Sequence, residues 1–373
     1  MGSDATPELA SRLDLAVGAA REAGQLTLGF FQREDLAVER KADNSPVTAA
    51  DRQAEQLLRR RIREAFPDDG ILGEEFGEEA GTSGFRWILD PIDGTKSFIC
   101  GVPLYGTLIG VERAGASVVG VIYIPGLDEC VYAAIGGGAW YTHGQAAPRP
   151  ARVAQRDRLA DAAFLTSQLD TYYLRGAQQV YLGLERAASI ARTWGDCYGY
   201  LLVATGRADV MVDPVMNVWD AAALQPILEE AGGVYTDWSG RPTIHVGEGI
   251  GCNRTLLDQV LAIDQASFAL PWPASAYRFE LFENPNSQLW VAQTQTAEGT
   301  TAVIGMSVVW LILDEAHIAT IAVHPDFRGQ GIAQLLMSTS LVGAIQQGCT
   351  QATLEVRESN WQAQRLYSRF RFE

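Results

Sequence analysis

The sequence predicts an α+β protein built from two domains. Its 373 residues exceed the length of one average domain, and 47% of them are hydrophobic, which is enough for two buried cores. Stretches with a helical spacing of apolar residues alternate with short β-branched and aromatic runs that are cut by Gly and Pro. The start of a second domain is indicated at residues 256–268, where a stretch with helical periodicity is followed by another predicted helix and strand. We therefore expect domains at 1–258 and 259–373.

The first domain is expected to open with two helices and to continue as a sheet. Apolar residues recur at helical spacing over residues 7–31 and again over residues 48–65, where Thr48 is a suitable N-cap. After Gly84, short strand-like runs are separated by tight turns. Helical spacing returns at residues 217–231, and a Gly stop, a strand and a turn follow it.

The charge and composition of the chain limit the classes of function. The formal net charge is -16, which argues against a nucleic-acid surface and would repel anionic substrates unless cations intervene. No window approaches the roughly 18 to 20 uninterrupted apolar residues of a membrane span, and the N-terminus lacks the features of a signal peptide. We therefore expect a cytoplasmic protein without nucleic-acid or membrane partners, whose five cysteines are reduced.

Acidic residues stand in four short stretches where a hard cation would need them. In "WILDPIDGTKSFICG" two aspartates flank a proline after an apolar run, and the turn can bring both carboxylates and an intervening carbonyl to one point. Oxygen ligands suit Mg²⁺ or Mn²⁺. Taken alone, each acid would more often be a turn former or a solvated loop residue. The acids of "TAAD", "GEEFG", "LDPIDGT" and "NVWDAAAL" are Asp51, Glu74, Glu75, Asp90, Asp93 and Asp220.

Together these stretches resemble the inositol-monophosphatase superfamily, whose signatures are a Glu-Glu loop, a DPxDGT box and a WD at a helix start. All three occur in the family's order within residues 8–262. The flanking stretches "DPIDGTKSFICGVPLYGTLIGV", "RTWGDCYGYLLVATGRADVMVDP" and "VWDAAALQPILEEAGGVYTDWSG" look most like the histidinol-phosphate phosphatases. The resemblance implies a layered α/β sandwich and Mg²⁺-dependent hydrolysis of a small phosphate monoester, namely histidinol phosphate in histidine biosynthesis. The alternative is an inositol-phosphate or broad sugar-phosphate phosphatase. We also expect a homodimer.

The resemblance also implies a metal site in this domain. Its side-chain ligands would be Glu74, Asp90, Asp93 and Asp220, and Ile92 would contribute its carbonyl oxygen. Two or three Mg²⁺ ions would then neutralise the phosphate and allow an acidic protein to bind an anionic ester.

Further roles concern the attacking water and the substrate. Thr95, with Asp51 behind it, would orient and deprotonate the water, so that Asp51, Glu74 and Thr95 form the catalytic set. The backbone N–H groups of Gly94 and Thr95 would hold the phosphate. Three residues fall where the family contacts the alcohol moiety, and the two carboxylates among them would suit a cationic amino or imidazole group. These residues are Gly195, Asp196 and Asp213.

A second motif lies in "IATIAVHPDFRGQGIAQLLM", where a Gly-rich loop separates an apolar strand from a helix. With "TLEVRESNWQAQRLYSRFRF" it resembles the GNAT acetyltransferases, most closely those that acetylate the N-terminal alanine of ribosomal proteins. The resemblance implies acetyl-CoA as the cofactor and a protein N-terminus as a partner. The coenzyme-binding residues would be Ile321, Val323, Arg328, Gly329, Gln330, Gly331, Ile332, Ala333 and Asn360.

Two more residues are candidates for the acetyl transfer itself. Glu355 would be the general base for the amine and Tyr367 the general acid for the departing thiolate, although a solvated strand residue and a core residue are equally good interpretations. The sequence has Arg371 where this family usually has Gly, and it stops at Glu373, before the family's last two strands. We therefore expect a C-terminally truncated acetyltransferase domain. The alternative is a non-catalytic CoA-binding or interaction module.

Overall fold

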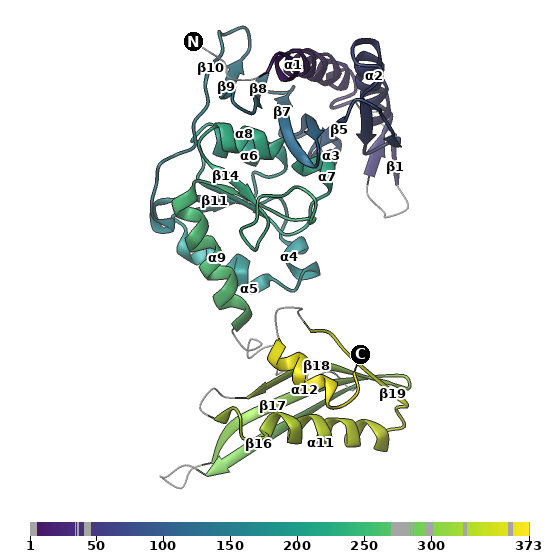
Figure 1. The fold of residues 1–373 in the computed structure, drawn as a ribbon, viewed down its shortest axis with the longest axis vertical. Helices are drawn as coiled ribbons and strands as arrows, with labels where there is room; N and C mark the ends of the chain where they lie inside the picture. Colours follow the sequence, from purple (N-terminus) through teal and green to yellow (C-terminus); the bar gives the residue numbers. More distant parts are fainter. Residues whose placement is uncertain are drawn as a thin grey trace. The chain divides into compact units, whose positions relative to one another are not determined.

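The chain folds into two compact units, Met1–Ala269 and Leu270–Glu373, in the computed structural model of Figure 1. The structure describes residues 6–33, 35, 37–40, 46–269, 284, 286–295, 301–323, 327–356 and 361–372. The expected domain boundary at 258/259 falls inside helix α9 (Arg254–Ala269), which belongs to the first unit. Within the described residues, no helix has both the length and the apolar character that crossing a membrane requires.

Helices α1 (Pro7–Leu28) and α2 (Ala49–Ala65) form the first layer of the first unit (Figure 1), as the helical spacing predicted. They cover one face of a sheet that has eight strands in the described residues, in the order β10-β9-β8-β7-β6-β5-β3-β4. All neighbours are antiparallel except β3 and β5. The strands are β3 (Gly70–Gly73), β4 (Gly77–Glu79), β5 (Phe85–Asp93), β6 (Gly106–Arg113), β7 (Ala116–Ile124), β8 (Glu129–Ala134), β9 (Ala139–His143) and β10 (Arg149–Pro150).

The other face of this sheet packs on an inner layer of helices and, beyond it, a second sheet. The inner helices are α6 (Cys197–Ala204), α7 (Val218–Ala221) and α8 (Leu224–Glu230). The second sheet has the described order β12-β11-β13-β15-β14, with β11 (Ala163–Leu165), β12 (Ile190–Arg192), β13 (Val210–Asp213), β14 (Val234–Thr236) and β15 (Gly249–Cys252). The outer helices α4 (Asp170–Leu174), α5 (Gln178–Ala187) and α9 close the last layer.

This layering explains why β5 reads as a continuous apolar run. Trp87, Ile88 and Leu89 are all fully buried, because one face of the strand meets α1 and α2 while the other meets the inner helices. The apolar run ends at Asp90, and the strand continues between the two layers to Asp93. Short elements complete the unit: the antiparallel pair of β1 (Val38–Arg40) and β2 (Pro46–Thr48), helix α3 (Thr95–Ile99) and the 3₁₀ turn η1 (Leu159–Asp161).

In the described residues of the second unit, four strands form a sheet in the order β16-β17-β18-β19. Strands β16 to β18 are antiparallel, and β19 is parallel to β18. The strands are β16 (Ser287–Gln295), β17 (Thr301–Ile312), β18 (Glu315–Val323) and β19 (Gln351–Leu354), and the helices are α11 (Ile332–Gln346) and α12 (Trp361–Ser368). The mixed α/β content of both units confirms the predicted fold class.

Strand β18 extends beyond the end of its neighbour β19. It pairs with β19 only from Glu315 to Ile318, whereas its ladder with β17 continues to Val323. The β17 ladder changes register between the partners of Val308 and Val309, which leaves Ala319 as an extra residue in β18. Strands β18 and β19 therefore form a fork at the described end of their ladder.

Candidate active site

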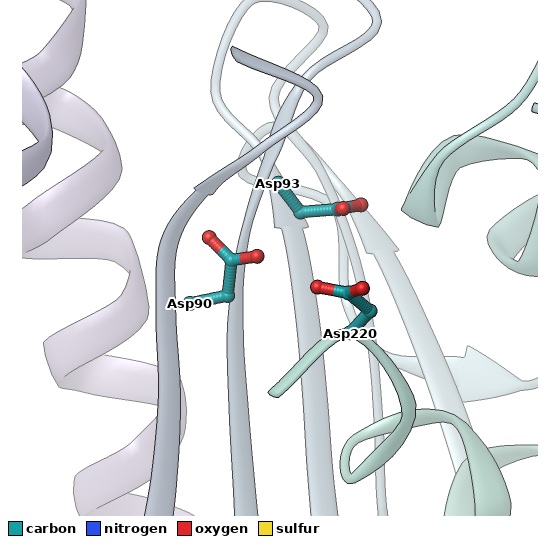
Figure 2. A group of neighbouring side chains, drawn as sticks. All are labelled: Asp90, Asp93 and Asp220. Atoms are coloured by element: carbon teal, nitrogen blue, oxygen red, sulfur yellow. The ribbon is translucent and has the colours of Figure 1, made fainter. Parts of the chain in front are cut away.

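Three carboxylates converge at the end of β5. Asp90 and Asp93 lie on that strand and Asp220 lies on α7, and an oxygen from each lies within 4.8 Å of the others. Figure 2 shows the three carboxylates gathered at one place beside the strand. Helix α7 belongs to the inner layer, so the cluster lies between the first sheet and the helices beneath it.

A bulge in β5 makes this convergence possible. Residues three apart on a regular strand point to opposite faces. Here Asp90 pairs with Leu108 but Asp93 pairs with Gly106, so two residues of β5 stand opposite the single residue Thr107. The hydroxyl of Thr107 donates to the Pro91 carbonyl at 3.0 Å and fixes the bulge. The extra residue turns Asp93 toward the side that Asp90 already faces.

Asp220 is oriented by its own helix. Its carboxylate accepts a hydrogen bond at 2.6 Å from the backbone N–H of Asn217, the other half of a capping box. Asp93 is fixed in a similar way, because the backbone N–H of Cys197 at the start of α6 donates to it. Both carboxylates thus retain oxygen lone pairs for another partner.

The electrostatics of this cluster favour a cation. Burial raises the pKa of Asp90 well above its usual range, and the charges of Glu74 and Asp93 raise it further. The pKa of Asp93 is also well above the usual range, through burial and then the charges of Asp196 and Asp220. Burial raises the pKa of Asp220 to about 7. Several carboxylates that repel one another in a low dielectric form a strong site for a positive charge.

The loop that carries Glu74 lies beside the cluster. Among the described residues, the group of oxygens within 4.8 Å contains Asp90, Asp93 and Asp220 but not Glu74. The backbone N–H of Glu74 donates to the Leu89 carbonyl at 3.2 Å, which attaches the loop to β5. Its charge contributes to the raised pKa values of Asp90 and Asp220, so Glu74 lies close to both.

The same loop is held from α2 by a buried ion pair. Glu55, which is 0% exposed, accepts hydrogen bonds from the backbone N–H groups of Glu75 at 2.7 Å and Phe76 at 3.3 Å. Arg59 pairs with Glu55 at 2.8 Å and donates to the Gly77 carbonyl. A Cβ atom at Gly73 would lie 2.0 Å from a Glu55 carboxylate oxygen, so glycine lets the carboxylate reach the loop. The motif analysis missed this pair.

Thr95 and Asp51 are held by different partners in the described residues. The Thr95 hydroxyl donates to the Ile92 carbonyl at 3.1 Å. Asp51 is 1% exposed and accepts from the backbone N–H of Thr48 at 2.8 Å and from its hydroxyl at 2.7 Å, forming the capping box of α2. Burial raises the pKa of Asp51. Gly94 has φ 86°, which suits glycine, and it precedes the first turn of α3.

Asp196 approaches the site from the start of α6. A Cβ atom at Gly94 would lie 2.8 Å from its carboxylate oxygen, so the carboxylate lies directly over the turn that follows Asp93. The backbone N–H of Asp196 donates to the hydroxyl of Ser167 at 2.9 Å. Burial and the charge of Asp213 raise the pKa of Asp196 to about 6, and Lys96 opposes this shift.

Asp213 lies near Asp196 and is 4% exposed. Its carboxylate accepts a hydrogen bond from the backbone N–H of Ser167 at 2.9 Å. Gly195 packs against the same serine, since a Cβ atom on it would lie 2.1 Å from the Ser167 Cα. Asp213 therefore supports Asp196 through Ser167. No motif singled out Ser167, and its position two residues after the end of β11 was the one signal that it carried.

In the second unit, the Gly-rich loop has the geometry of a helix start. Gly329 has φ 76°, and Gly331 has φ 82° and caps α11. Arg328 donates to the Val323 carbonyl at 3.1 Å. Ile321 lies on β18, opposite Ser307, in the part of the strand that extends beyond β19. Gln330, Ile332 and Ala333 complete the loop and the first turn of α11.

The two residues predicted for acetyl transfer, and Asn360 predicted for coenzyme binding, differ in their settings. Glu355 directly follows β19 and is exposed. Tyr367 lies on α12 and packs against the core of this unit, where burial raises the pKa of its phenol. Asn360 lies outside the described residues.

The first unit thus has the layered architecture and the acidic site of a metal-dependent phosphatase. The chain belongs to the inositol monophosphatase family, which residues 8–268 match. Residues 257–372 match the acetyltransferase (GNAT) family, so the second unit carries a GNAT domain. Both families, and the enzyme class predicted for the first unit, are confirmed.

Individual relatives resemble the first unit. The chain is 46% identical to a histidinol-phosphatase of Chlorobaculum parvum over 64% of this chain and 90% of the relative. It is 38% identical to a histidinol-phosphatase of Mycobacterium tuberculosis over 67% of this chain and 96% of the relative. A solved structure, the extragenic suppressor protein suhB from Bartonella henselae, aligns with a TM-score of 0.63 at 30% identity, over 68% of this chain and 98% of that protein.

Proposed function

We propose that the first unit hydrolyses histidinol phosphate to histidinol and phosphate in a reaction that requires Mg²⁺, or Mn²⁺ in its place. The observation that carries the proposal is the convergence of Asp90, Asp93 and Asp220 at the end of β5. Two relatives that align over most of their length are named histidinol-phosphatase, which supports this substrate. The alternative, an inositol-phosphate or sugar-phosphate phosphatase, differs in the alcohol that the site accepts.

The donor set fits a hard divalent cation. It consists of carboxylate oxygens, which Mg²⁺ prefers, and burial holds the pKa values of these carboxylates high while their charges are uncompensated. Asp90, Asp93 and Asp220 would hold the cation, together with Glu74 and the Ile92 carbonyl. When bound, Mg²⁺ would supply charge neutralisation at the phosphate and lower the pKa of the attacking water.

The chain's own groups would then bind and orient the ester. The N–H groups of Gly94 and Thr95, at the start of α3, would donate to phosphate oxygens. The Thr95 hydroxyl donates a hydrogen bond to the Ile92 carbonyl, so its oxygen is left to accept a hydrogen bond from the attacking water and to orient it. Asp51 would add a negative charge behind this point and favour loss of a proton from that water.

The specificity proposal concerns Asp196. Its carboxylate lies over Gly94, next to the position proposed for the phosphate, and a cationic amine or imidazole on the alcohol side would pair with it. Asp213 is buried and bonds to Ser167, which supports a role in holding Asp196 in place rather than in direct contact. Inositol carries no cation and gains nothing from Asp196.

Phosphate release from a panel of esters tests this proposal. The purified full chain is assayed with histidinol phosphate, inositol monophosphate and a sugar phosphate, after EDTA treatment and after addition of Mg²⁺ or Mn²⁺. We expect no turnover without metal, recovery with either metal, and the highest kcat/KM for histidinol phosphate. Turnover by the EDTA-treated protein would contradict the metal requirement, and a preference for inositol monophosphate would favour the alternative.

For the second unit, we propose that it binds acetyl-CoA, with the diphosphate at the N–H groups of residues 329–333 and the pantetheine arm along Ile321 and Val323. The glycine conformations at the start of α11 support the first contact, and the extension of β18 beyond β19 supports the second. Calorimetry with acetyl-CoA tests this. Heat of binding is expected in the wild type and not in Gly331→Glu, which adds bulk and a negative charge at the loop. Equal affinity in both proteins would place the coenzyme elsewhere.

A further inference from the structure

Four side chains of the second unit form a connected row on one face of its sheet. Trp310 of β17 is paired in register with His317 of β18, and His317 is paired with Thr353 of β19. The rings of Trp310 and His317 stack with centroids 5.5 Å apart and planes 20° from parallel. Nδ1 of His317 lies 3.0 Å from the Thr353 hydroxyl, and that hydroxyl donates to the Glu315 carboxylate at 2.5 Å.

The direction of these hydrogen bonds fixes the tautomer of His317. An ionised carboxylate can only accept, so the single proton of the Thr353 hydroxyl points to Glu315. The hydroxyl oxygen must then accept from His317, which requires the imidazole proton to be on Nδ1. The neutral ring therefore keeps a basic lone pair on Nε2. This is the tautomer that a general base needs, with a carboxylate placed behind it to stabilise the imidazolium.

The row lies at the fork of the sheet and on the face away from the core. Ala316 and Ile318 point into the core and are 0% and 5% exposed, so His317 between them faces the other way. The ladder between β18 and β19 ends at Ile318, one residue after His317, and Ala319 is the bulge. Beyond this point runs the part of β18 to which we assign the pantetheine arm, so the thioester end of that arm would lie near the fork.

We propose that His317 is the general base of an N-acetyltransferase site in the second unit, with Thr353 and Glu315 as residues that position it; this rests on the proposed binding of acetyl-CoA. An amine is mostly protonated at neutral pH and cannot attack a thioester in that form. Nε2 of His317 takes one proton from the ammonium group. The amine nitrogen then bonds to the acetyl carbon, the carbon–sulfur bond breaks, and the second amine proton goes to the departing thiolate. His317 returns its proton to water.

The proposal differs from the prediction that Glu355 is the base. Glu355 is exposed just past the end of β19, and within the described residues no hydrogen bond or ion pair holds its carboxylate in place. His317 is oriented by a stacked ring on one side and a two-step hydrogen-bonded chain on the other. Both side chains belong to the same end of the sheet, so variants can separate them.

Acetyl transfer by the full chain tests the proposal. CoA thiol release is followed from pH 6 to pH 9 with acetyl-CoA and a peptide that begins with alanine. His317→Gln should lower kcat by about 10²-fold or more at neutral pH, since positioned bases contribute about 10²-fold to 10⁴-fold. Its acetyl-CoA affinity in calorimetry should match that of the wild type. Glu355→Gln is the comparison variant that tests the competing base, and its kcat should fall far less than that of His317→Gln.

Two substitutions at Thr353 separate positioning from packing. Thr353→Val keeps the shape but removes the acceptor for Nδ1–H, and it should lower kcat by roughly tenfold. Thr353→Ser restores the hydroxyl and should restore the rate. The nitrogen chemical shifts of ¹⁵N-labelled histidine should report the Nδ1–H tautomer of His317 in the wild type and its loss in Thr353→Val.

Three outcomes would overturn the proposal. The first is normal kcat in His317→Gln while Glu355→Gln is inactive, and the second is an Nε2–H tautomer in the wild type. The third is a wild type that binds acetyl-CoA but releases no thiol in the presence of the peptide. A wild type that does not bind acetyl-CoA would instead contradict the proposed cofactor, and the base would then have no substrate.

Discussion

Asp196 combines a strained backbone with a buried carboxylate. Its φ of 52° and ψ of -154° lie in a region that is used almost only by glycine, and a side chain there costs roughly 1 to 3 kcal/mol. The hydrogen bond to Ser167 and the close packing of Gly195 hold this conformation. Its carboxylate lies over the turn at Gly94 that we propose to bind phosphate, so substrate recognition explains a residue kept at such a cost more easily than folding does.

Replacing Asp196 should therefore separate stability from specificity. Asp196→Gly relieves the backbone strain and should raise the melting temperature. It should also lower kcat/KM for histidinol phosphate about tenfold to a hundredfold, because a charge-assisted contact is worth roughly 1.5 to 3 kcal/mol. For inositol monophosphate the change should be small. Equal losses on both esters would remove Asp196 from recognition of the alcohol. Asp213→Asn, which disturbs the support of Asp196, serves as a comparison and should show the same selective loss in a weaker form.

Thr95 offers a second test at the level of a single hydroxyl. Thr95→Ala removes the hydrogen-bond acceptor proposed to orient the attacking water and should lower kcat by about 10²-fold, while Mg²⁺ affinity changes far less. Thr95→Ser retains the hydroxyl and should stay close to the wild-type rate. Single-turnover phosphate release and a Mg²⁺ titration measure the two quantities. Weakened metal binding with normal single-turnover chemistry would instead make Thr95 a support for the Ile92 carbonyl.

Among the elements, helix α2 links two parts of the site. Asp51, Glu55 and Arg59 are spaced by four residues and share one helix face. Asp51 lies near the charge of Glu74, and the Glu55–Arg59 pair binds the backbone of the loop that carries Glu74. The position of this loop relative to β5 thus depends on the helix.

Breaking this link should weaken metal binding before it stops the chemistry. Glu55→Gln leaves Arg59 buried beside a neutral partner and loosens the Glu74 loop, so Mg²⁺ affinity should fall by about tenfold. The kcat at saturating Mg²⁺ should fall less. Glu64→Gln, an exposed acid on the same helix, is the control. Affinity is read from Mg²⁺-dependent shifts of the melting temperature, and unchanged affinity in a folded Glu55→Gln protein would contradict the role of the pair.

The sequence predicts most of these elements because their signals are local. Helical spacing predicts α1 and α2, and Thr48 is the N-cap of α2 in the structure. The acids of the DPxDGT box could be identified, but their shared direction depends on the pairing of β5 with β6, which lies outside the motif. The hydrogen bonds of Ser167 and Glu55 bring together residues far apart in the chain, and no single sequence shows such a contact.

At the scale of the whole molecule, the acidic cluster should connect metal binding to folding stability. The folded state holds the pKa of Asp220 at about 7, whereas an unfolded Asp titrates near 3.9. The folded metal-free protein therefore binds more protons than the unfolded chain between about pH 4 and pH 7. Its stability should fall as the pH rises through this window. Mg²⁺ binds the ionised carboxylates, so its stabilising effect should grow as the pH rises.

Thermal unfolding of the wild type and Asp220→Asn at pH 5, 6, 7 and 8, with EDTA or Mg²⁺, measures this linkage. Asparagine can still accept the hydrogen bond from Asn217 but does not ionise, so the cap of α7 is retained. In EDTA, the difference in melting temperature between the variant and the wild type should increase with pH, because the wild type must ionise one more buried acid than the variant. With Mg²⁺ that difference should shrink or change sign at pH 8. A difference that stays constant across the pH range in EDTA would mean that Asp220 titrates normally in the folded protein. In that case, charge repulsion between Asp220 and the neighbouring carboxylates would not explain why the site at the end of β5 should prefer a cation.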